Sequence, residues 1–412
     1  MSKDREGGLM RYILLTHNDL DGVSCGILAK LAFGELVDVH YHSVNSLDYH
    51  IEQLMKEQSD KNHSCTIYIT DLSVNKDNEM RLKKYVQRGG LVQLIDHHKT
   101  ALHFNEYEWG DVRIEESKGK LASATSLFYS HLQKQNLLKE HSSLSEYVEL
   151  VRQYDTWEWE RMENIHAKHL NDLLFLQSIE EFEQSMVERL SIQESFSFNE
   201  FEEKLLKIED KKTERYIKRK KRELIQAFIG DKCIGVVHAE SYHSELGNEL
   251  GKEHPHLDCI AIVNMGNKKM GFRTIHDHID VSEIAAQYGG GGHAKAAGCS
   301  LTPEAYQAFI DKTFSLKPLR MDHSHNKMNL KQQCAHYENY EKKHFLLYKS
   351  KENKWQVEKD HHLLPDDFST FEEAERFIKR TYSAYLSKDD MLIHYLIDSS
   401  DSKQKKQTKS KA

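Results

Sequence analysis

The sequence predicts an α/β protein with two lobes, in which a larger N-terminal domain with a parallel sheet is joined by a helical linker to a smaller α/β domain, followed by a small C-terminal module. Three observations predict this architecture. The length of 412 residues corresponds to two or three domains at roughly 150 residues each. Short apolar runs alternate with helical patterns from Arg11 onward, and the alternation restarts after a charged helical stretch at residues 198–228.

The composition limits the classes of function that the chain can have. Lys and Arg number 57 and Asp and Glu number 65, which gives a formal net charge of -8. This balance disfavours capture of nucleic acid by overall charge, so any phosphate site must be local. No apolar run approaches the roughly 18 to 20 residues that a membrane span requires, and we expect no membrane partner. The six cysteines include no Cys-x-x-Cys pair, which indicates reduced thiols in a cytoplasmic protein.

The first domain is expected over residues 10–195. Its predicted strands are four short apolar runs, at residues 12–15, 37–44, 66–70 and 91–95. Helical spacing is found at residues 23–33 and 78–88 and predominates from residue 121 to about 190. Ligands of parallel sheets bind at the carboxyl ends of the strands. Polar residues at those ends are therefore the first candidates for a site.

Four further segments complete the expected organisation. We assign them to a helical linker, a second α/β domain, a small α+β module and a disordered basic tail, at residues 196–229, 230–316, 317–398 and 399–412. The second domain has its own apolar runs, at residues 233–238, 259–263 and 269–275. The tail is rich in lysine and has almost no apolar residues, so it has little surface to bury.

The first candidate site residues follow the first strand, in the segment His17-Asn18-Asp19-Leu20-Asp21-Gly22. Alternate positions of an extended segment point the same way, so His17, Asp19 and Asp21 can share one side of the turn. Gly22 permits a tight entry into the next helix. These features suit a metal site. An Asp-rich turn that only caps the helix explains the segment equally well.

Two further strand ends favour the metal site. Asp71 follows the third predicted strand, and the triplet Asp96-His97-His98 ends the fourth. Three strand ends therefore bring carboxylate or imidazole groups to one edge of the sheet. Such a mixture suits Mn²⁺ or Mg²⁺ better than Zn²⁺. Asp155 is a further candidate, because an acid at the end of a helical stretch opposes the helix dipole.

The order of these motifs resembles that of the DHH phosphoesterase superfamily, which is named for the triplet found here as Asp96, His97 and His98. The glycine-rich stretch 289–298 resembles the signature of the associated DHHA1 domain. The matching motifs extend from Arg11 to about residue 316. One residue separates His17 from Asp19, a spacing closer to the RecJ exonucleases than to the pyrophosphatases of the superfamily. The motif segments are most similar to its bacterial oligoribonucleases.

The resemblance implies two Mn²⁺ ions, with Mg²⁺ as the alternative. One ion would be held by His17, Asp19 and Asp71, and the other by Asp21, Asp71, His97 and Asp155. Such a pair activates a water for attack on phosphorus. His98 would stabilise the phosphate charge or protonate the leaving oxygen, with Asp96 in the same catalytic group. A hydrogen bond that orients a metal ligand is the alternative role for His98.

The second domain has candidate substrate-binding residues. Gly290, Gly291 and Gly292 leave the backbone free to approach an anionic group, and His293 can add a donor. A turn with tight helix packing explains the glycines equally well. Arg273 lies on a predicted strand and can bind phosphate through two hydrogen bonds. It matches the arginine that binds substrate in the family.

Two other features favour a structural interpretation. Asp360-His361-His362 repeats the Asp-His-His triplet, but no apolar strand precedes it and it lies outside the motif order. We interpret it as not functional. Trp157 and Trp159 can stack on a nucleobase, but we interpret them as packing residues beside Asp155.

The resemblance predicts a manganese-dependent enzyme that degrades short single-stranded RNA to 5′-mononucleotides as a 3′ to 5′ exoribonuclease. A site for a few nucleotides needs few positive groups, which fits the acidic composition. Two alternatives stay open. One is a phosphatase or phosphodiesterase acting on 3′-phosphoadenosine 5′-phosphate or on cyclic nucleotides such as cAMP, and the other is an RNA-binding regulator without catalysis. We expect a homodimer.

Overall fold

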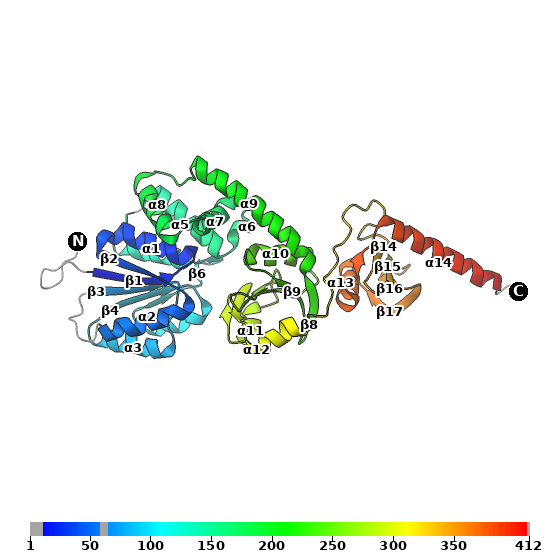
Figure 1. Cartoon of the computed structure of the whole chain (residues 1–412), viewed down its shortest axis with the longest axis horizontal. Coiled ribbons are helices and arrows are strands. Elements are labelled where there is room, and N and C mark those ends of the chain that lie inside the picture. Colours follow the sequence, from blue (N-terminus) through cyan, green and yellow to red (C-terminus); the bar gives the residue numbers. More distant parts are fainter. Residues whose placement is uncertain (1–10, 58–64, 140, 410–412) are drawn as a thin grey trace. The chain divides into compact units, whose positions relative to one another are not determined.

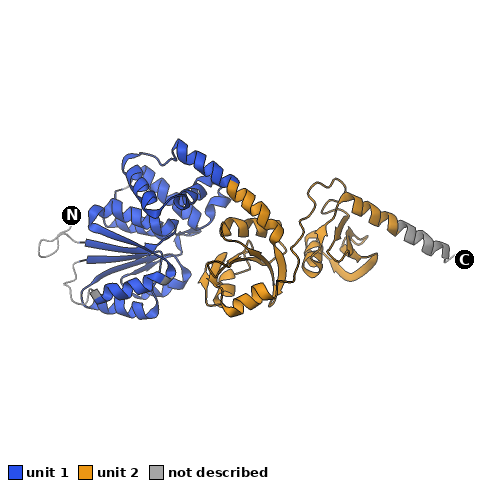
Figure 2. Cartoon of the chain, viewed as in Figure 1, with its two compact units in different colours: residues 1–211 blue, residues 212–412 orange. Residues whose placement is uncertain are grey.

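The computed structural model describes residues 11–57, 65–139 and 141–409. The chain forms two compact units, residues 1–211 and 212–412 (Figure 2). The boundary between them falls inside helix α9 (Glu200–Lys220), which lies in the charged stretch between the two α/β patterns. None of the helices in the described ranges has both the length and the apolar composition of a membrane span.

The first unit is built on a parallel sheet of five strands in the order β2-β1-β3-β4-β5 (Figure 1). The strands are β1 (Arg11–His17), β2 (Val37–His42), β3 (Cys65–Thr70), β4 (Leu91–Asp96) and β5 (Gly110–Val112). Because all five strands run the same way, their carboxyl ends lie along one edge. This confirms the predicted parallel α/β sheet.

Helices cover both faces of this sheet, with α1 on one side and α2 and α3 on the other (Figure 1). Leu14 and Tyr68 pack into the core beside α1, whereas Leu15 and Ile67 belong to the core beside α2 and α3. The strands therefore bury both faces, which is why they appear in the sequence as continuous apolar runs. The helices before α9 are α1 (Leu20–Phe33), α2 (Val44–Glu57), α3 (Lys76–Gln87), α4 (Ala124–Lys134), α5 (Ser142–Asp155), α6 (Glu158–Arg161), α7 (Ile165–Phe175) and α8 (Ile179–Ile192).

Short elements link β4 to α4. They are a 3₁₀ helix (Lys99–Glu106), β5, and a small hairpin of β6 (Glu115–Ser117) and β7 (Lys120–Leu121).

The second unit begins with a mixed sheet of six strands in the order β12-β13-β11-β10-β9-β8, in which only β9 and β10 are parallel. Its elements are β8 (Ile225–Ile229), β9 (Lys232–His238), α10 (His243–Glu253), β10 (Cys259–Asn264), β11 (Lys269–Arg273), α11 (Val281–Ala286), β12 (Gly291–Gly292), β13 (Ala296–Ser300) and α12 (Pro303–Tyr306). Residues 225–229 were expected in the helical linker. They form an edge strand instead, because the neighbouring Leu224 is fully buried and fixes this segment beside β9.

The C-terminal module is an antiparallel sheet of five strands in the order β17-β16-β15-β14-β18. Its elements are β14 (Ala335–Glu338), β15 (His344–Lys349), β16 (Trp355–Lys359), β17 (His362–Phe368), α13 (Phe371–Tyr382), β18 (Tyr385–Leu386) and α14 (Asp389–Lys409). Helix α14 continues into residues 399–409, which we expected to be disordered. Buried Leu392 and Tyr395 attach its first turns to the sheet. Residues 410–412 lie outside the described ranges.

Candidate metal centre

The turn from β1 into α1 places His17 and Asp19 together. A Cβ atom on Gly22 would lie 2.3 Å from the carbonyl oxygen of His17, so only glycine allows the helix to start this close to the strand. One carboxylate oxygen of Asp19 accepts from the backbone N–H of Gly22 at 3.0 Å and caps α1. The other lies 2.7 Å from His17 Nδ1. Asp19 therefore caps the helix and also takes part in the polar cluster.

Asp71 lies at the centre of the cluster. It follows β3 with a left-handed backbone (φ 60°), a conformation that costs energy in a residue with a side chain and that clusters at functional sites. Its side chain is 2% exposed. One oxygen lies 3.6 Å from His17 Nδ1, and the other lies 3.3 Å from His97 Nε2. Asp71 therefore contacts residues from both neighbouring strand ends.

Asp21 is fixed by the start of α4. Its two carboxylate oxygens accept backbone hydrogen bonds from Ala124 at 2.6 Å and from Thr125 at 2.9 Å. The Thr125 hydroxyl also donates to the Asp21 carbonyl oxygen at 2.7 Å. The positive end of the α4 dipole favours the carboxylate at this place. Sequence reasoning provides only a weak signal for Thr125, because the contact joins residues far apart in the chain.

The Asp-His-His triplet divides into an orienting residue and two side chains that face the cluster. Asp96 Oδ1 accepts from the backbone N–H groups of His97 and His98, at 2.7 Å and 3.2 Å, and lies 2.7 Å from His98 Nδ1. Nδ1 of His97 lies 3.5 Å from Oδ2 of Asp155, the last residue of α5. Asp155 thus joins the strand ends from a separate helix.

Crowding of acids and burial shift the pKa values of the cluster. Burial alone would lower the pKa of His17, but its hydrogen bond to Asp19 and the nearby carboxylate of Asp71 raise it to about 11. Burial raises the pKa of Asp155 to about 6, against the opposing effect of His97. Burial and the charges of Asp71 and Asp155 also raise the pKa of Asp21. A divalent cation would relieve this crowding by neutralising the carboxylates.

The donor set fits a metal centre. Two groups have ligand atoms that all lie within 4.8 Å of one another, namely His17, Asp19 and Asp71, and Asp21, His97 and Asp155. Asp71, Asp96, His97 and His98 form a further group on the same criterion. Within the described ranges, Oδ2 of Asp71, Asp96 and Asp155 is buried and accepts no hydrogen bond. Buried oxygens of this kind are costly unless another ligand binds them.

The predicted substrate residues of the second unit lie together in its own sheet. Arg273 on β11 pairs with Ala296 of β13, and Gly292 of β12 pairs with the next residue, Ala297. The guanidinium of Arg273 donates to the Ser244 hydroxyl at 3.0 Å and to the carbonyl oxygen of Phe272. The backbone N–H of His293 donates to Ala296 at 2.8 Å, which closes the turn between the two strands.

The three glycines differ in their surroundings. A Cβ atom on Gly290 would lie 2.1 Å from the carbonyl oxygen of Gly298, and Gly292 has a φ of 138°. Both positions therefore require glycine for structural reasons. A Cβ atom on Gly291 would have no heavy atom within 4 Å. Of the three glycines, Gly291 is therefore the one that the local structure does not require.

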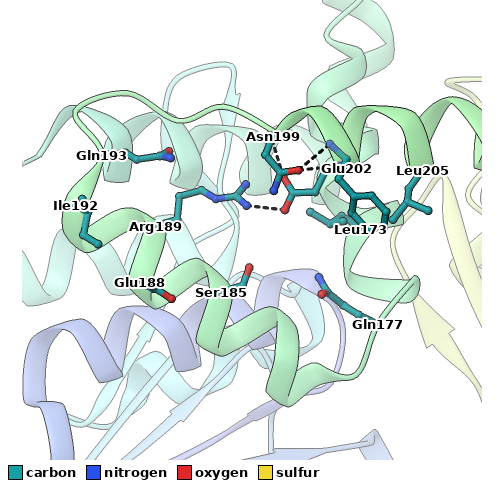
Figure 3. A pocket seen from close by; sticks show the side chains of 11 residues that line it. Leu173, Gln177, Ser185, Glu188, Arg189, Ile192, Gln193, Asn199, Glu202 and Leu205 are labelled. Carbon is teal, nitrogen blue, oxygen red and sulfur yellow. Dashed lines mark hydrogen bonds and ion pairs between the residues drawn. The ribbon is translucent and has the colours of Figure 1, made fainter.

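Two other features lie apart from the metal cluster. Asp360 and His361 both have positive φ values and connect β16 to β17, so the second Asp-His-His forms a hairpin turn. A hollow formed by α7, α8 and the start of α9 includes the ion pair of Arg189 with Glu202 (Figure 3). None of the predicted metal ligands lines it.

Comparisons with known proteins identify both parts of the second unit. Residues 239–316 match the DHHA1 domain, and residues 334–406 match the oligoribonuclease NrnB C-terminal domain. The chain is 52% identical to oligoribonuclease NrnB of Bacillus subtilis (strain 168) over 389 residues, which cover 94% of this chain and 97% of the relative.

Among solved structures, RecJ of Thermus thermophilus in complex with Mn²⁺ is 12% identical, covers 74% of this chain and 51% of its own, and gives a TM-score of 0.44. The pGpG-specific phosphodiesterase PggH of Vibrio cholerae is 16% identical, covers 74% and 97%, and gives a TM-score of 0.43. The similarity to NrnB extends over nearly the whole chain. The chain therefore belongs to the NrnB family of DHH/DHHA1 phosphoesterases.

Proposed function

We propose that this chain is a Mn²⁺-dependent phosphodiesterase, with Mg²⁺ as the alternative ion, that degrades short single-stranded RNA to 5′-mononucleotides from the 3′ end. The observation that carries the proposal is the position of Asp71 between His17 and His97, within reach of both candidate ligand groups. The 52% identical relative is named an oligoribonuclease, which supports RNA as the substrate.

The residues are assigned to two metal positions. His17, Asp19 and Asp71 would hold one ion. Asp21, Asp71, His97 and Asp155 would hold the other. When bound, two divalent ions supply a nucleophilic water at neutral pH and screen the phosphate charge. The chain contributes a fixed set of ligands, because the backbone of α4 holds Asp21 and the start of α1 holds Asp19.

His98 is assigned to the phosphate or the leaving oxygen. Its Nδ1 donates to Asp96 Oδ1 at 2.7 Å, and the negative charge of Asp96 stabilises the protonated imidazole. The hydrogen bond also fixes the orientation of the ring, so Nε2 remains the nitrogen that can donate to substrate. Asp96 is therefore a positioning residue, which acts by orienting His98 and the backbone of the triplet.

The second unit is assigned to substrate binding. Arg273 presents a planar guanidinium that suits phosphate. Gly291 has no side chain to keep an anionic group away from the backbone, and His293 lies two residues further on. These few groups are enough for a substrate of a few nucleotides, which agrees with the net charge of -8.

A time course with 5′-labelled five-nucleotide RNA tests the proposal. Reactions contain the full chain with Mn²⁺, the full chain with EDTA, or the double variant Asp96→Ala, His97→Ala with Mn²⁺. We expect a metal-dependent ladder that shortens from the unlabelled end, and no products in the other two reactions. Immediate release of labelled mononucleotide would reverse the proposed direction.

Absence of cleavage by a wild-type chain that binds Mn²⁺ would exclude the oligoribonuclease function. The same preparation is then assayed with 3′-phosphoadenosine 5′-phosphate and with cAMP. Turnover of either compound would establish the small-nucleotide alternative.

A further inference from the structure

The turn that follows Asp155 has a feature that the metal centre does not explain. Trp157 starts α6 in the left-handed conformation, with φ 60° and ψ 14°. A bulky aromatic residue rarely adopts this conformation, which costs roughly 1 to 2 kcal/mol. No side-chain hydrogen bond of Trp157 caps the helix. The backbone strain is therefore not compensated by helix capping.

The strained turn is held in place by a buried arginine. The side chain of Arg152 is 2% exposed and forms ion pairs with Glu149 at 2.6 Å and with Glu158 at 2.8 Å. It also donates to the carbonyl oxygen of Leu121 at 2.9 Å. Arg152 thereby ties α5, which ends at Asp155, to the first residue of α6. Such bracing is what a strained conformation needs in order to persist.

The indole of Trp157 is held in a defined orientation. Its Nε1 donates to Glu160 Oε2 at 3.1 Å, and its ring lies edge-on to Trp159 with centroids 5.3 Å apart. The ring of Tyr154 is tilted relative to the indole, with a centroid distance of 6.2 Å. The Trp157 side chain remains half-buried and is not enclosed in the core. A rigid, partly accessible aromatic face is a suitable surface for stacking.

The position of this ring relates it to the reaction. Trp157 follows Asp155 by two residues, so their Cα atoms lie within about 7.6 Å of each other. Oδ2 of Asp155 contacts the ring of His97 at 3.5 Å. A nucleotide whose phosphate lies at this centre brings its sugar and base to the immediate surroundings. Stacking on an aromatic face tolerates every base, which suits an enzyme for short RNAs of varied sequence.

We propose that Trp157 forms the wall of a nucleobase subsite, on which the base of a nucleotide beside the scissile phosphate stacks. This inference rests on the proposed function and adds a residue that determines substrate binding. The left-handed turn at Trp157 puts a large aromatic residue within two positions of Asp155.

The test combines variants of the ring with RNAs that lack a base. Trp157→Gly removes the ring, and glycine adopts the left-handed conformation without strain, so this variant should fold normally. Trp157→Phe keeps an aromatic face. Asn136→Gly is the matched control, because exposed Asn136 has a similar φ of 56° in a turn of the same unit. The substrates are one five-nucleotide RNA and two copies of it, abasic at the 3′ or the 5′ terminal residue.

We expect the wild-type chain to lose about 5- to 150-fold in kcat/KM on one of the abasic RNAs, the range that corresponds to the loss of one stacking contact. Trp157→Gly should show a similar loss on the intact RNA, mainly through KM, and no further loss when the base is absent. Trp157→Phe should retain most of the wild-type efficiency. Asn136→Gly should behave as the wild type on all three RNAs.

If Trp157→Gly and the abasic residue each lower kcat/KM and the two losses multiply when combined, the inference is overturned. Such a result would show that the ring and the base do not interact. An unchanged KM in Trp157→Gly would overturn it as well. If one of these two results is obtained while the wild type still cleaves the intact RNA, the proposed function stands without this subsite. Failure of the wild type to cleave any RNA would overturn both.

Discussion

Thr125 holds Asp21 through two contacts that join residues 104 positions apart. Its backbone N–H donates to the Asp21 carboxylate at 2.9 Å, and its hydroxyl donates to the Asp21 carbonyl oxygen at 2.7 Å. Both side chains are buried. The start of α4 thereby fixes the carboxylate of Asp21, which itself lies in the first turn of α1.

Removal of the hydroxyl should weaken the metal centre. In Thr125→Val the shape of the side chain is nearly kept, but the hydrogen bond from the hydroxyl to the Asp21 carbonyl oxygen is lost and the carboxylate becomes less well oriented. We expect the affinity for Mn²⁺ to fall about 10- to 100-fold, as is usual when a group that orients a ligand is lost. Isothermal titration of the metal-free chain with Mn²⁺ measures this affinity.

Thr313→Val is the matched control for Thr125→Val. The Thr313 hydroxyl is also buried and donates to a carbonyl oxygen, that of Phe309, at 2.7 Å. Both variants should lose about 1 to 3 kcal/mol of stability, and only Thr125→Val should lose metal affinity. Equal Mn²⁺ affinities of the two variants would show that Thr125 has no specific effect on the site.

His98→Gln should separate catalysis from metal binding. If His98 acts on the phosphate or on the leaving oxygen, its loss should lower kcat about 10²- to 10⁴-fold. The Mn²⁺ affinity should stay within a few-fold of the wild type, because the proposed ligands are other residues. Single-turnover cleavage of the five-nucleotide RNA and Mn²⁺ titration provide the two quantities.

His103→Gln serves as the control, since His103 lies five residues further on and is half exposed. It should leave both quantities unchanged. A large loss of Mn²⁺ affinity in His98→Gln would instead make His98 a metal ligand. That outcome is possible because His98 belongs to the group of Asp71, Asp96 and His97.

The fold could be predicted where burial leaves a simple pattern. Strands β1 and β4 are buried on both faces and appear as apolar runs, so the parallel sheet followed from the sequence. Helix α2 was not predicted, although Leu47, Ile51 and Leu54 are buried and lie at helical spacing, a pattern that could have identified it. Strand β17 is exposed along most of its length and includes Pro365, so its sequence is typical of a loop.

The strand-end residues of the site could also be predicted, because their chemistry follows directly from their position on the sheet. Asp71 and the triplet at residues 96–98 are examples. The partners that orient them could not. Thr125 reaches Asp21 only after α4 has packed against α1, and no local pattern encodes that contact. The left-handed backbone of Trp157 could not be predicted either; in the structure the ion pair of buried Arg152 with Glu158 spans it.

Neighbouring glycines in the second unit distinguish a structural from a substrate-binding role. Gly290→Ala would place a Cβ atom 2.1 Å from the Gly298 carbonyl oxygen, so the backbone must move and stability should fall by about 1 to 3 kcal/mol. Gly291→Ala has open space around its Cβ and should unfold at the wild-type temperature. If the backbone of Gly291 approaches a phosphate, KM for the five-nucleotide RNA should rise about tenfold or more in this variant.

Thermal unfolding and steady-state kinetics of both glycine variants provide the comparison. A Gly291→Ala chain with wild-type stability and wild-type KM would remove this glycine from the substrate site. The glycine stretch would then be fully explained by the packing of β12 against β13.

Acid should weaken the contact between the second α/β domain and the C-terminal module, where the buried histidines His254 and His256 lie near Lys379 of α13. Burial, together with the positive charge of Lys379, lowers the pKa of His254 to about 4 and that of His256 to about 2. The pKa of histidine in an unfolded chain is about 6.5. As the pH falls below 6.5, the unfolded chain therefore takes up protons before the folded one does. Stability is kept above pH 6.5 and is lost between about pH 6.5 and the folded pKa values.

Each buried histidine should cost about 2 kcal/mol at pH 5 relative to neutral pH. His254→Gln cannot take up the proton, so the variant should lose about 2 kcal/mol less than the wild type between pH 7.5 and pH 5. Urea unfolding in EDTA, followed by hydrogen exchange of α13, measures the difference without a contribution from bound metal. His325→Gln, at an exposed position, is the control and should lose as much as the wild type. If acid lowers the free energy of unfolding equally in His254→Gln and in the wild type, His254 takes up its proton as readily in the folded chain as in the unfolded one. The hydrogen bonds of Arg380 to Asp258 would then hold the module independently of His254.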